Sequence, residues 1–394
     1  EDKKAASHFH LESLENLSRH MSPSTRLGAV VLSVLFLLVL PTTRGAPAEG
    51  VVKGWPVDKP LMPKVHADSL HKYNPKYPLT PPVATEHGFK YRIGLINDGD
   101  VTSKVSNGTW TSQFKTGYLE WRPNQGKGGE VVFEWDEEPV QFTTHFGYED
   151  RGMELSDLIV YDGRLLTFDD KTGLVYELDL ESKMAIPWIF LGAGNGKTTK
   201  GQKSEWATKR DNLLYVGSSG NELAKNGVVK NKDLMWIKVI TPEGLVTHED
   251  WEQRYDALRK QVGVQFPGSL VHESALWSDV HQRWFFMPLR KLDGPFDRQT
   301  YPHLSTNILL SADANFQDLK NITVGNVHGD HGFCSFKFIP GTEDKVVVAL
   351  KSEDQVVDGK PQYSTHIMVF LIDGTVIQDE LRISDLKFEG IEFI

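Results

Sequence analysis

The sequence has little cysteine and no excess of positive charge. Cys334 is the single cysteine in 394 residues. The chain therefore cannot form an internal disulfide, which taken alone favours a reducing compartment. Aspartate and glutamate number 53 against 43 lysines and arginines, which gives a formal charge of −10. Binding to a nucleic-acid backbone requires a basic face, so we exclude a nucleic-acid partner but not a local basic pocket for a small anion.

Long apolar runs are also lacking. The run from Leu27 to Leu40 is shorter than the roughly 20 residues that a membrane-spanning helix needs. It follows Arg26 and precedes small residues in segment 42–48, a pattern typical of a secretory signal peptide. We predict that residues 1–20 are an upstream extension absent from the mature protein, that residues 21–46 are a signal peptide, and that the protein is secreted. The alternative is an uncleaved type II membrane anchor, which would hold the protein in the lumen of the endoplasmic reticulum or Golgi.

The sequence also contains two candidate glycosylation sites and a proline-rich segment before the predicted strands. Asn107 and Asn321 each begin an Asn-X-Thr triplet, the acceptor sequence for glycosylation of exported proteins. Residues 47–84 are rich in proline, lysine, histidine and tyrosine. We therefore expect an extended arm without a core of its own in this part of the chain.

Helical periodicity is scarce. From Tyr91 onward short strand-like runs follow one another, and turn signals such as Asp162-Gly163 and Asp373-Gly374 close them. One helical pattern stands out, at Trp251–Val262. Antiparallel strands without alternating helices indicate a sandwich, a barrel or a propeller, and about 300 residues are too many for one sandwich or small barrel. We predict an all-β fold, a β-propeller of five or six four-stranded blades over residues 85–394.

Several familiar catalytic motifs are absent. The segment Gly192–Thr198 is similar to a phosphate-binding loop, but Leu191 stands where that pattern needs glycine. Asn221 likewise replaces the last glycine of a nucleophile elbow after Gly217. No EF-hand loop is present, so any calcium site must be built in another way. We expect neither a phosphate-binding loop nor a covalent nucleophile.

Carboxylates do occur inside apolar, strand-like segments, as at Glu205, Glu273 and Glu389. A buried carboxylate is unfavourable unless it is paired or binds a metal, and each of these taken singly could be a structural ion pair. Together with Ser156 and Cys334 they recur at rough blade intervals. One inward residue from each blade would converge on the propeller axis, where several oxygens favour a hard cation such as Ca²⁺.

Several segments, in order, resemble the soluble calcium-activated nucleotidase family, which includes salivary apyrases of some blood-feeding arthropods. These segments are Arg151–Leu158, Lys203–Trp206, His272–Ala275, His331–Pro340 and Glu389–Ile394. The resemblance runs from about Tyr77 to Ile394. It implies a five-bladed β-propeller with calcium in the central tunnel, and hydrolysis of nucleoside di- and triphosphates.

The resemblance implies that calcium is held at Ser156, Glu205, Glu273, Cys334 and Glu389. Cys334 departs from the family pattern, which has serine at this position. Because a thiol is a poor ligand for calcium, we expect Cys334 to act through its backbone carbonyl. The neighbouring Ser335 would point to the other face of the strand.

The resemblance also implies residues that act on the phosphates. The candidate catalytic residues are Asp98, Asp100, Glu154, Asp157 and Arg151. We expect Asp98, Asp100 or Glu154 to position or deprotonate the attacking water, and Arg151 to hold the phosphates. The candidate substrate-binding residues are Lys115, Asp169, Asp170, Trp206 and Arg290. Of these, the basic residues would neutralise phosphate oxygens, and Trp206, Trp110 or Tyr176 would stack on the base.

Two alternatives stay open. A calcium-stabilised propeller could bind a protein or a sugar without catalysis, and a calcium-dependent lactonase or esterase also places calcium in a propeller tunnel. The acidic pair Asp98 and Asp100 with Arg151 favours a hydrolase, since a binding protein has no need for it beside calcium. We therefore expect a nucleotide substrate (ADP, UDP, GDP or ATP), Ca²⁺ as cofactor and, as the resemblance implies, a calcium-linked homodimer.

Overall fold

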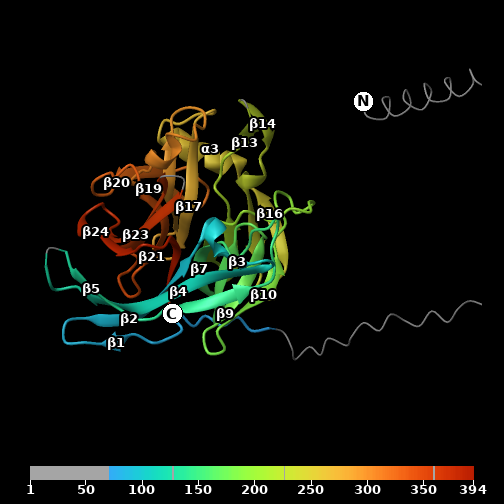
Figure 1. The fold of residues 1–394 in the computed structure, drawn as a ribbon. Coiled ribbons are helices and arrows are strands. Elements are labelled where there is room, and N and C mark those ends of the chain that lie inside the picture. The colour runs from blue at the N-terminus through green and yellow to red at the C-terminus, as the bar shows by residue number, and fades with distance from the viewer. Residues whose placement is uncertain (1–70, 127, 226, 358–359) are drawn as a thin grey trace, which may run out of the picture. The chain divides into compact units, whose positions relative to one another are not determined.

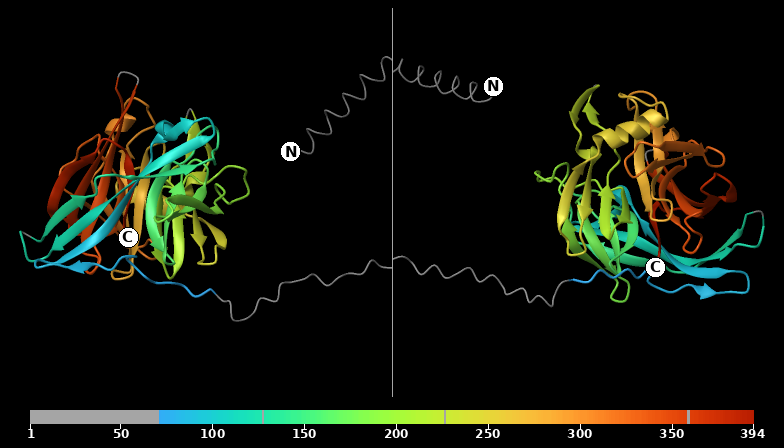
Figure 2. Two further views of the ribbon diagram at one scale, coloured as in Figure 1. Left: turned by 60° about the horizontal axis from the view of Figure 1, so that its bottom comes forward. Right: turned by 180° about the vertical axis from the view of Figure 1, so that it is seen from behind.

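The fold is that of a computed structural model, which describes residues 71–394 except 127, 226 and 358–359. The predicted signal peptide and the first part of the predicted arm lie outside the described residues. Nearly all of the regular structure is antiparallel sheet, and Figures 1 and 2 display the sheets side by side around a common centre. This confirms the predicted all-β class and the β-propeller. No described helix is long and apolar enough to cross a membrane.

Four blades are antiparallel sheets of four strands. In three of them the strands follow one another directly along the chain, and in the second a separate hairpin intervenes between the second and third strands. The first has β7 (Leu155–Tyr161), β8 (Arg164–Asp169), β9 (Leu174–Asp179) and β10 (Met184–Phe190). The second has β11 (Trp206–Arg210), β12 (Leu213–Gly217), β15 (Trp236–Ile240) and β16 (Val246–Asp250). The third has β17 (Ser269–Ser278), β18 (Arg283–Leu292), β19 (Ile308–Asp313) and β20 (Leu319–Thr323). The fourth has β21 (Gly332–Phe338), β22 (Val346–Val357), β23 (Lys360–Leu371) and β24 (Val376–Ser384).

A fifth, seven-stranded sheet joins the two ends of the described chain. Its strands are β1 (Val83–Ala84), β2 (Phe89–Asn97), β3 (Lys104–Ser106), β4 (Thr109–Arg122), β5 (Glu130–Trp135), β6 (Val140–Thr144) and β25 (Phe388–Phe393). The last strand, β25, pairs with β2, so that Leu95 lies opposite Ile391. The C-terminal segment is thus part of the same sheet as the first long strand of the fold.

The innermost strands form a closed ring. β25 contacts β7, β7 contacts β11, β11 contacts β17, β17 contacts β21, and β21 contacts β25. These strands are mostly buried on both faces because sheets pack against them from either side. The outer strands β10, β16, β20 and β24 contain only exposed and partly exposed residues. Apolar side chains between neighbouring sheets form the core, and the ring brings the ends of five strands to one place.

In the described residues, helical structure is confined to short segments between strands. The helix α3 (Glu252–Gln261) confirms the predicted one at Trp251–Val262, and it buries Tyr255 and Leu258. The 3-10 turns in the part of the chain that the structure describes are η2 (Asp100–Ser103), η3 (Asp233–Met235) and η4 (Tyr301–His303). The strands β13 (Leu223–Lys225) and β14 (Val228–Asn231) form a separate hairpin.

The described part of the arm lies against the end of the propeller where the inner strand β25 ends. The hydroxyl of Tyr77 donates to Glu392 Oε1 at 2.9 Å, and the ring of Tyr73 lies 5.8 Å from that of Tyr161. The two predicted glycosylation acceptors, Asn107 and Asn321, are both exposed. Their modification stays a prediction.

Candidate active site

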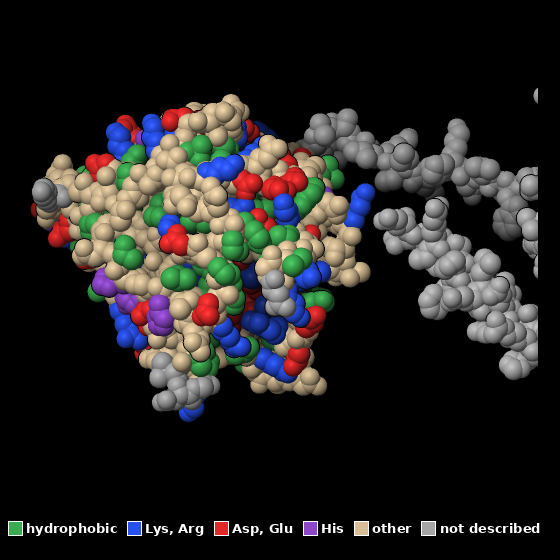
Figure 3. Space-filling model, turned by 90° about the horizontal axis from the view of Figure 1, so that it is seen from above, with side chains coloured by type: hydrophobic (Ala, Val, Ile, Leu, Met, Phe, Trp, Pro, Cys, Tyr) green, Lys and Arg blue, Asp and Glu red, His purple; other side chains and the backbone are tan. Residues whose placement is uncertain are grey.

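A polar cavity opens at the end of the ring where β25 begins. It has a volume of about 190 Å³. Its acidic wall residues are Asp98, Asp100, Asp170, Glu205, Glu273, Asp354 and Glu389, and its basic ones are Arg151, Lys171, Lys203, Arg290 and Lys387. Leu289, Tyr301 and Ser352 complete the lining. All five sheets, or the loops beside them, contribute lining residues, so the cavity depends on the closed ring. Figure 3 displays basic and acidic side chains on the face of the molecule seen from above.

The inner strands are irregular where the metal-binding residues were predicted. The pairing of β7 with β8 skips from Leu155 to Leu158, and Ser156 lies in this interval. Glu273 lies in the interval of β17 between His272 and Ala275. Two further register shifts leave Cys334 on β21 and Glu389 on β25 outside the regular ladder. Such β-bulges leave a residue unpaired and redirect its side chain, which explains how a continuous strand can present polar groups toward the axis.

Glu205 reaches the cavity in a different way, because it comes just before β11. Its backbone N–H donates to the carbonyl of Gly217 at 2.8 Å, and the residue is 3% exposed. Burial and the nearby charge of Glu273 raise the pKa of Glu205 to about 8, although the ammonium of Lys203 acts in the opposite direction. Burial also raises the pKa of Glu273 and, together with the charge of Asp98, that of Glu389. A cation at this place would relieve the mutual repulsion of these carboxylates.

Buried oxygens of two cavity-lining residues, and of Ser156, which does not line the cavity, have no hydrogen-bond partner among the described residues. They are Ser156 Oγ, Glu273 Oε2 and Asp170 Oδ1. A buried oxygen without a partner is unfavourable unless a ligand or an ion binds to it. Hydroxyl and carboxylate oxygens are the donors that a hard cation such as calcium prefers. The residues present therefore fit a calcium ion.

The Cys334 thiol makes a contact away from these oxygens. It donates to the backbone carbonyl of Phe388 at a sulfur–oxygen distance of 3.4 Å. Burial and the carboxylate of Glu389 raise the pKa of this thiol well above its usual value. The side chain is therefore a neutral thiol bonded to β25, rather than a thiolate free to bind a metal.

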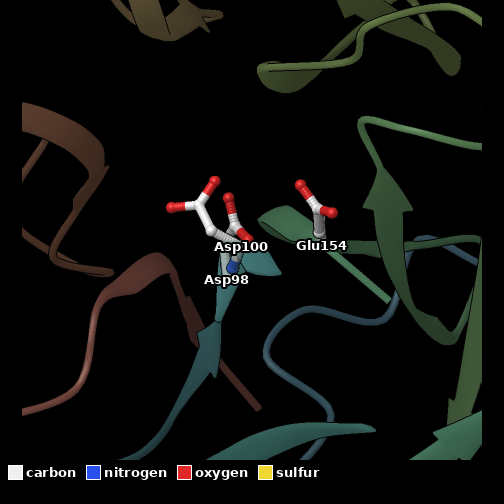
Figure 4. Close-up of side chains that lie close together, drawn as sticks. All are labelled: Asp98, Asp100 and Glu154. Atoms are coloured by element: carbon white, nitrogen blue, oxygen red, sulfur yellow. Dashed lines mark hydrogen bonds between the residues drawn. The ribbon is translucent and has the colours of Figure 1, made fainter. Parts of the chain in front are cut away.

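A second group of carboxylates lies just after β2 and just before β7. Asp98 and Asp100 of this group line the cavity, whereas Glu154 is fully buried and does not line it. Carboxylate oxygens of Asp98, Asp100 and Glu154 all lie within 4.8 Å of one another. Figure 4 displays Asp98 and Asp100 side by side, with Glu154 beside them in the segment just before β7. Arg151 joins the two sides: its Nε donates to Glu154 Oε1 at 2.6 Å, and its Nη2 donates to Asp100 Oδ1 at 3.1 Å.

The surroundings separate the pKa values of these three carboxyls. Burial raises the pKa of Glu154 to about 8, and the charges of Asp98 and Asp170 add to this. Burial likewise raises the pKa of Asp98, against the effect of the Lys387 ammonium 3.0 Å away. For Asp100 burial is outweighed by Lys387 and Arg151, which lower its pKa. Carboxyls with separated pKa values are a common feature of sites that transfer protons.

Two lysines complete the site, and the residue assignments from sequence missed both. Lys203 contacts Asp170 at 2.6 Å and also pairs with Glu205. Lys387 pairs with Asp98 and Asp100 and lies 3.3 Å from Glu389. Each lysine stands two positions before a glutamate, in Lys203-Ser204-Glu205 and Lys387-Phe388-Glu389. This repeated Lys-X-Glu spacing is the signal that could have identified them.

Arg290 is a buried basic residue of the cavity wall. Its side chain lies on β18, the residue is 6% exposed, and its Nε has no hydrogen-bond partner among the described residues. Its guanidinium lies 4.5 Å from the centre of the Tyr301 ring. A buried guanidinium without a carboxylate partner is a ready site for an anion such as phosphate.

Three predicted substrate-binding residues do not line the cavity: Lys115, Trp206 and Asp169. Lys115 is on β4, and its ammonium lies 5.4 Å from the centre of the Trp135 ring. Trp206 is fully buried against Trp251 and Trp284, and its indole N–H donates to the carbonyl of Ser218 at 3.1 Å. Trp206 points away from the cavity because successive side chains along a strand point to opposite faces, and the neighbouring Glu205 points toward it. Trp110 and Tyr176, the other stacking candidates, are buried in the core as well.

Asp157 and Asp169 make contacts that hold the backbone together. Asp157 accepts hydrogen bonds from the N–H groups of Leu158 and Ala207 and from the side chains of Ser335 and Lys337, so it links three inner strands. Asp169 accepts from the N–H groups of Met153, Lys171 and Thr172. Neither lines the cavity, although Asp170, the next residue, does.

Comparisons with known proteins identify the family of the chain. The apyrase family profile matches residues 99–394. Soluble calcium-activated nucleotidase 1 of Rattus norvegicus is 42% identical over 84% of this chain and 80% of its own length. An apyrase of Cimex lectularius is 38% identical over 84% of this chain and 89% of its own length.

A further relative and one solved structure extend the comparison. A Caenorhabditis elegans apyrase is 36% identical over 77% of this chain and 84% of its own. A putative 6-phosphogluconolactonase of Bacteroides uniformis covers 77% of this chain and 99% of its own, at 8% identity and a TM-score of 0.34, too weak for any conclusion. The relatives confirm the resemblance inferred from the sequence: the chain belongs to the apyrase family.

Proposed function

We propose that this protein hydrolyses the terminal phosphoanhydride bond of nucleoside di- and triphosphates and requires calcium to do so. The observation that carries the proposal is the central cavity, where carboxylates from separate sheets face lysine and arginine side chains. Phosphoryl transfer needs an arrangement that positions a polyanion and balances its charge, since little covalent chemistry is left to the protein. Membership of the apyrase family and the names of the relatives support the same activity.

The proposal includes the architecture that the family resemblance implies. We take the seven-stranded sheet as a fifth blade, with β25 as its innermost strand. The contacts of β25 with both β7 and β21 support this, since they complete the ring of inner strands. The cavity would then open on the axis of a five-bladed propeller.

Calcium would be held by Ser156, Glu205, Glu273 and Glu389, and by the backbone carbonyl of Cys334. The buried oxygens of Ser156 and Glu273 that lack a partner support this set, and so does the hydrogen bond that occupies the Cys334 thiol. When bound, the ion supplies positive charge that stabilises the phosphate oxygens during the reaction. Hydroxyl, carboxylate and carbonyl oxygens are suitable ligand atoms for calcium.

The side chains of the chain itself would perform the remaining steps. Arg290, with no carboxylate partner among the described residues, would bind phosphate oxygens together with Arg151 and Lys203. Water would attack the terminal phosphorus, while the bond from that phosphorus to the bridging oxygen breaks and releases orthophosphate. Glu154 would accept the proton of this water, because its raised pKa makes its carboxylate a stronger base than an ordinary one.

The contacts of the remaining predicted residues favour structural roles. Asp157 would join the inner strands, Asp169 would hold the turn that carries Asp170, and Trp206 would fill the core. Lys115 would act outside the substrate site. We also propose secretion after cleavage of the segment that contains Leu27–Leu40, for which the exposed acceptors Asn107 and Asn321 give support.

The test is release of phosphate from ADP, ATP, UDP and GDP by purified protein that starts near Ala46. The assay would compare calcium, magnesium and a calcium chelator. Release that needs calcium supports the proposal and reveals the preferred nucleotide. If no nucleotide is hydrolysed while calcium still raises the thermal stability, the protein is a calcium-stabilised binding propeller instead.

A further inference from the structure

A cluster of histidines lies on the fourth blade and lines no part of the polar cavity. His328 and His331 stand three positions apart in the segment just before β21, and His366 lies on β23. The ring of His331 lies 5.4 Å from that of His328 and 4.0 Å from that of His366, between centroids. Figure 3 displays histidine side chains close together near one edge of the face seen from above. The fold thus gathers imidazoles from two distant segments.

The turn that carries two of these histidines is held by backbone hydrogen bonds. The N–H of His331 donates to the carbonyl of His328 at 3.1 Å, which closes the turn. The N–H of Ser305 donates to the carbonyl of Gly329, inside the turn, at 2.9 Å. These contacts fix the turn against the segment that follows η4. His328 therefore stays beside His331, although its side chain is exposed.

Glu380, on β24, decides which nitrogen of His331 is free. His331 Nδ1 lies 2.7 Å from Glu380 Oε2, and because a carboxylate only accepts, Nδ1 carries the proton and donates it. The other oxygen of Glu380 pairs with the buried ammonium of Lys351, which holds the carboxylate in place. A histidine that binds a metal through one nitrogen usually donates its other N–H to a carboxylate in this way.

The second nitrogen of His331 faces another carboxylate. His331 Nε2 lies 3.9 Å from Glu353 Oε2, on β22, and the hydroxyl of Ser364 donates to the same oxygen at 2.6 Å. Two atoms that accept hydrogen bonds and face each other repel unless a proton or a cation lies between them. Two ligands of one tetrahedral zinc ion lie about 3.4 Å apart, so a shift of about half an ångström would let both atoms bind one ion.

His366 adds a buried nitrogen that lacks a partner. The residue is 8% exposed, and its Nδ1 has no hydrogen-bond partner among the described residues. A buried polar atom of this kind is unfavourable unless a ligand or an ion binds to it. Imidazole nitrogen suits zinc and similar transition metals, whereas calcium and magnesium prefer oxygen. The chemistry of the cluster therefore differs from that of the proposed calcium site.

We propose that His328, His331, His366 and Glu353 bind a divalent transition metal such as Zn²⁺, at a site separate from that of calcium. Three imidazoles and one carboxylate are ligands that zinc accepts in a tetrahedral arrangement. The ion would join the turn before β21 to the strands β22 and β23, and would thereby stabilise the fourth blade. None of the four residues lines the polar cavity, so the proposal does not depend on the proposed hydrolysis.

The experiment measures zinc binding by calorimetry to purified protein without a polyhistidine tag, with calcium in excess to fill the cavity. The unmodified protein should bind one zinc ion per chain that calcium does not displace. With Co²⁺ in place of zinc, visible absorption should indicate tetrahedral coordination. His331→Gln and His366→Gln should each weaken zinc binding at least about tenfold. His87→Gln, at an exposed histidine on another sheet edge, should bind zinc like the unmodified protein.

Thermal unfolding provides a second measurement. Zinc should raise the Tm of the unmodified protein and of His87→Gln, because the ion binds the folded state. His328→Gln alters an exposed side chain, so it tests the site even if the variants at the more buried histidines do not fold; its zinc affinity should fall about tenfold. If the unmodified protein binds no zinc, or if His328→Gln and His331→Gln bind it as tightly as the unmodified protein, the site is overturned. A proton rather than a metal ion would then lie between His331 and Glu353.

Discussion

At the scale of single residues, the alternation of side chains along a strand decides which predicted residues reach the cavity. Glu205 and Trp206 are neighbours in one segment, yet Glu205 lines the cavity and Trp206 fills the core. The sequence correctly predicted that Glu205, Glu273 and Glu389 converge, because a carboxylate within an apolar strand requires a partner or a metal. It could not predict the place of Trp206, since an aromatic residue suits a core and a stacking site equally well.

Lys203 and Lys387 could not be identified as site residues from their own sequence positions. Lys203 and Lys387 read as ordinary surface charges when each is considered alone, because lysine is seldom buried. The structure pairs them with carboxylates from other segments, as Lys387 with Asp98 and Lys203 with Asp170. Such partners are distant in sequence, so only the repeated Lys-X-Glu spacing was available to indicate them.

Ser156→Ala tests whether the hydroxyl binds calcium. Ser156 Oγ has no hydrogen-bond partner among the described residues, so its removal should leave the stability in chelator within about 0.5 kcal/mol. The calcium concentration for half-maximal phosphate release should rise about tenfold, because one oxygen donor is lost. Ser106→Ala, at an exposed serine of β3, is the control and should change neither quantity. An unaltered calcium requirement in Ser156→Ala would remove Ser156 from the proposed ligands.

Cys334→Ser tests which group of this residue binds calcium. If the backbone carbonyl is the ligand, the calcium requirement should stay within about twofold, because the substitution leaves the carbonyl in place. Titration of calcium against phosphate release measures it. A requirement that falls about tenfold would instead mean that a side-chain hydroxyl at this position is a ligand, and that the thiol weakens the site.

At the scale of elements, the sequence predicted strands and turns better than their pairing. Turn signals such as Asp162-Gly163 separate strands as expected, and the helix at α3 lies where its periodicity indicates. The bulges at Ser156, Glu273 and Cys334 were not predicted, since register depends on the partner strand and a shift of one residue changes which face each side chain occupies. The pairing of β25 with β2 likewise joins segments from opposite ends of the fold.

Ile391→Ala tests the importance of β25 for the closed ring. Ile391 is fully buried on this strand, so its truncation should lower the free energy of unfolding by about 3 kcal/mol through lost burial and the cavity left behind. Denaturant unfolding monitored by tryptophan fluorescence measures the change. Ile186→Ala on the outer strand β10 is the matched control, because Ile186 is 43% exposed and should lose far less stability. Equal losses at the two sites would contradict a special role of the inner strand.

At the scale of the whole molecule, the closed ring places one acidic cavity at one end and a buried carboxyl at the other. Glu392, on β25, accepts hydrogen bonds from Tyr77 of the arm and from the N–H of Val160. Burial raises the pKa of Glu392 from 4.5 to about 7. A carboxyl with a raised pKa in the folded protein favours folding at low pH, and this contribution is lost as the pH rises through the folded value.

Glu392→Gln should therefore flatten the dependence of stability on pH. In the unmodified protein this group should account for a loss of about 3 kcal/mol between pH 4.5 and pH 8, which follows from the size of its pKa shift. Unfolding at several pH values in chelator measures this dependence, and Glu138→Gln at an exposed position serves as control. If Glu392→Gln and the unmodified protein lose stability equally over this range, the pKa of Glu392 is not raised in the folded protein.

The central claim is that calcium-dependent hydrolysis takes place in the cavity where the inner strands meet. The most direct measurement is phosphate release from a nucleoside diphosphate as calcium is titrated, compared among the unmodified protein, Glu205→Gln and the exposed control Glu138→Gln. We predict calcium-dependent release by the unmodified protein and the control, and a loss of at least about a hundredfold in Glu205→Gln, because the substitution removes a carboxylate charge at the metal. Release by Glu205→Gln at the level of the control, with the same calcium dependence, would contradict the claim and move the reaction elsewhere in the molecule.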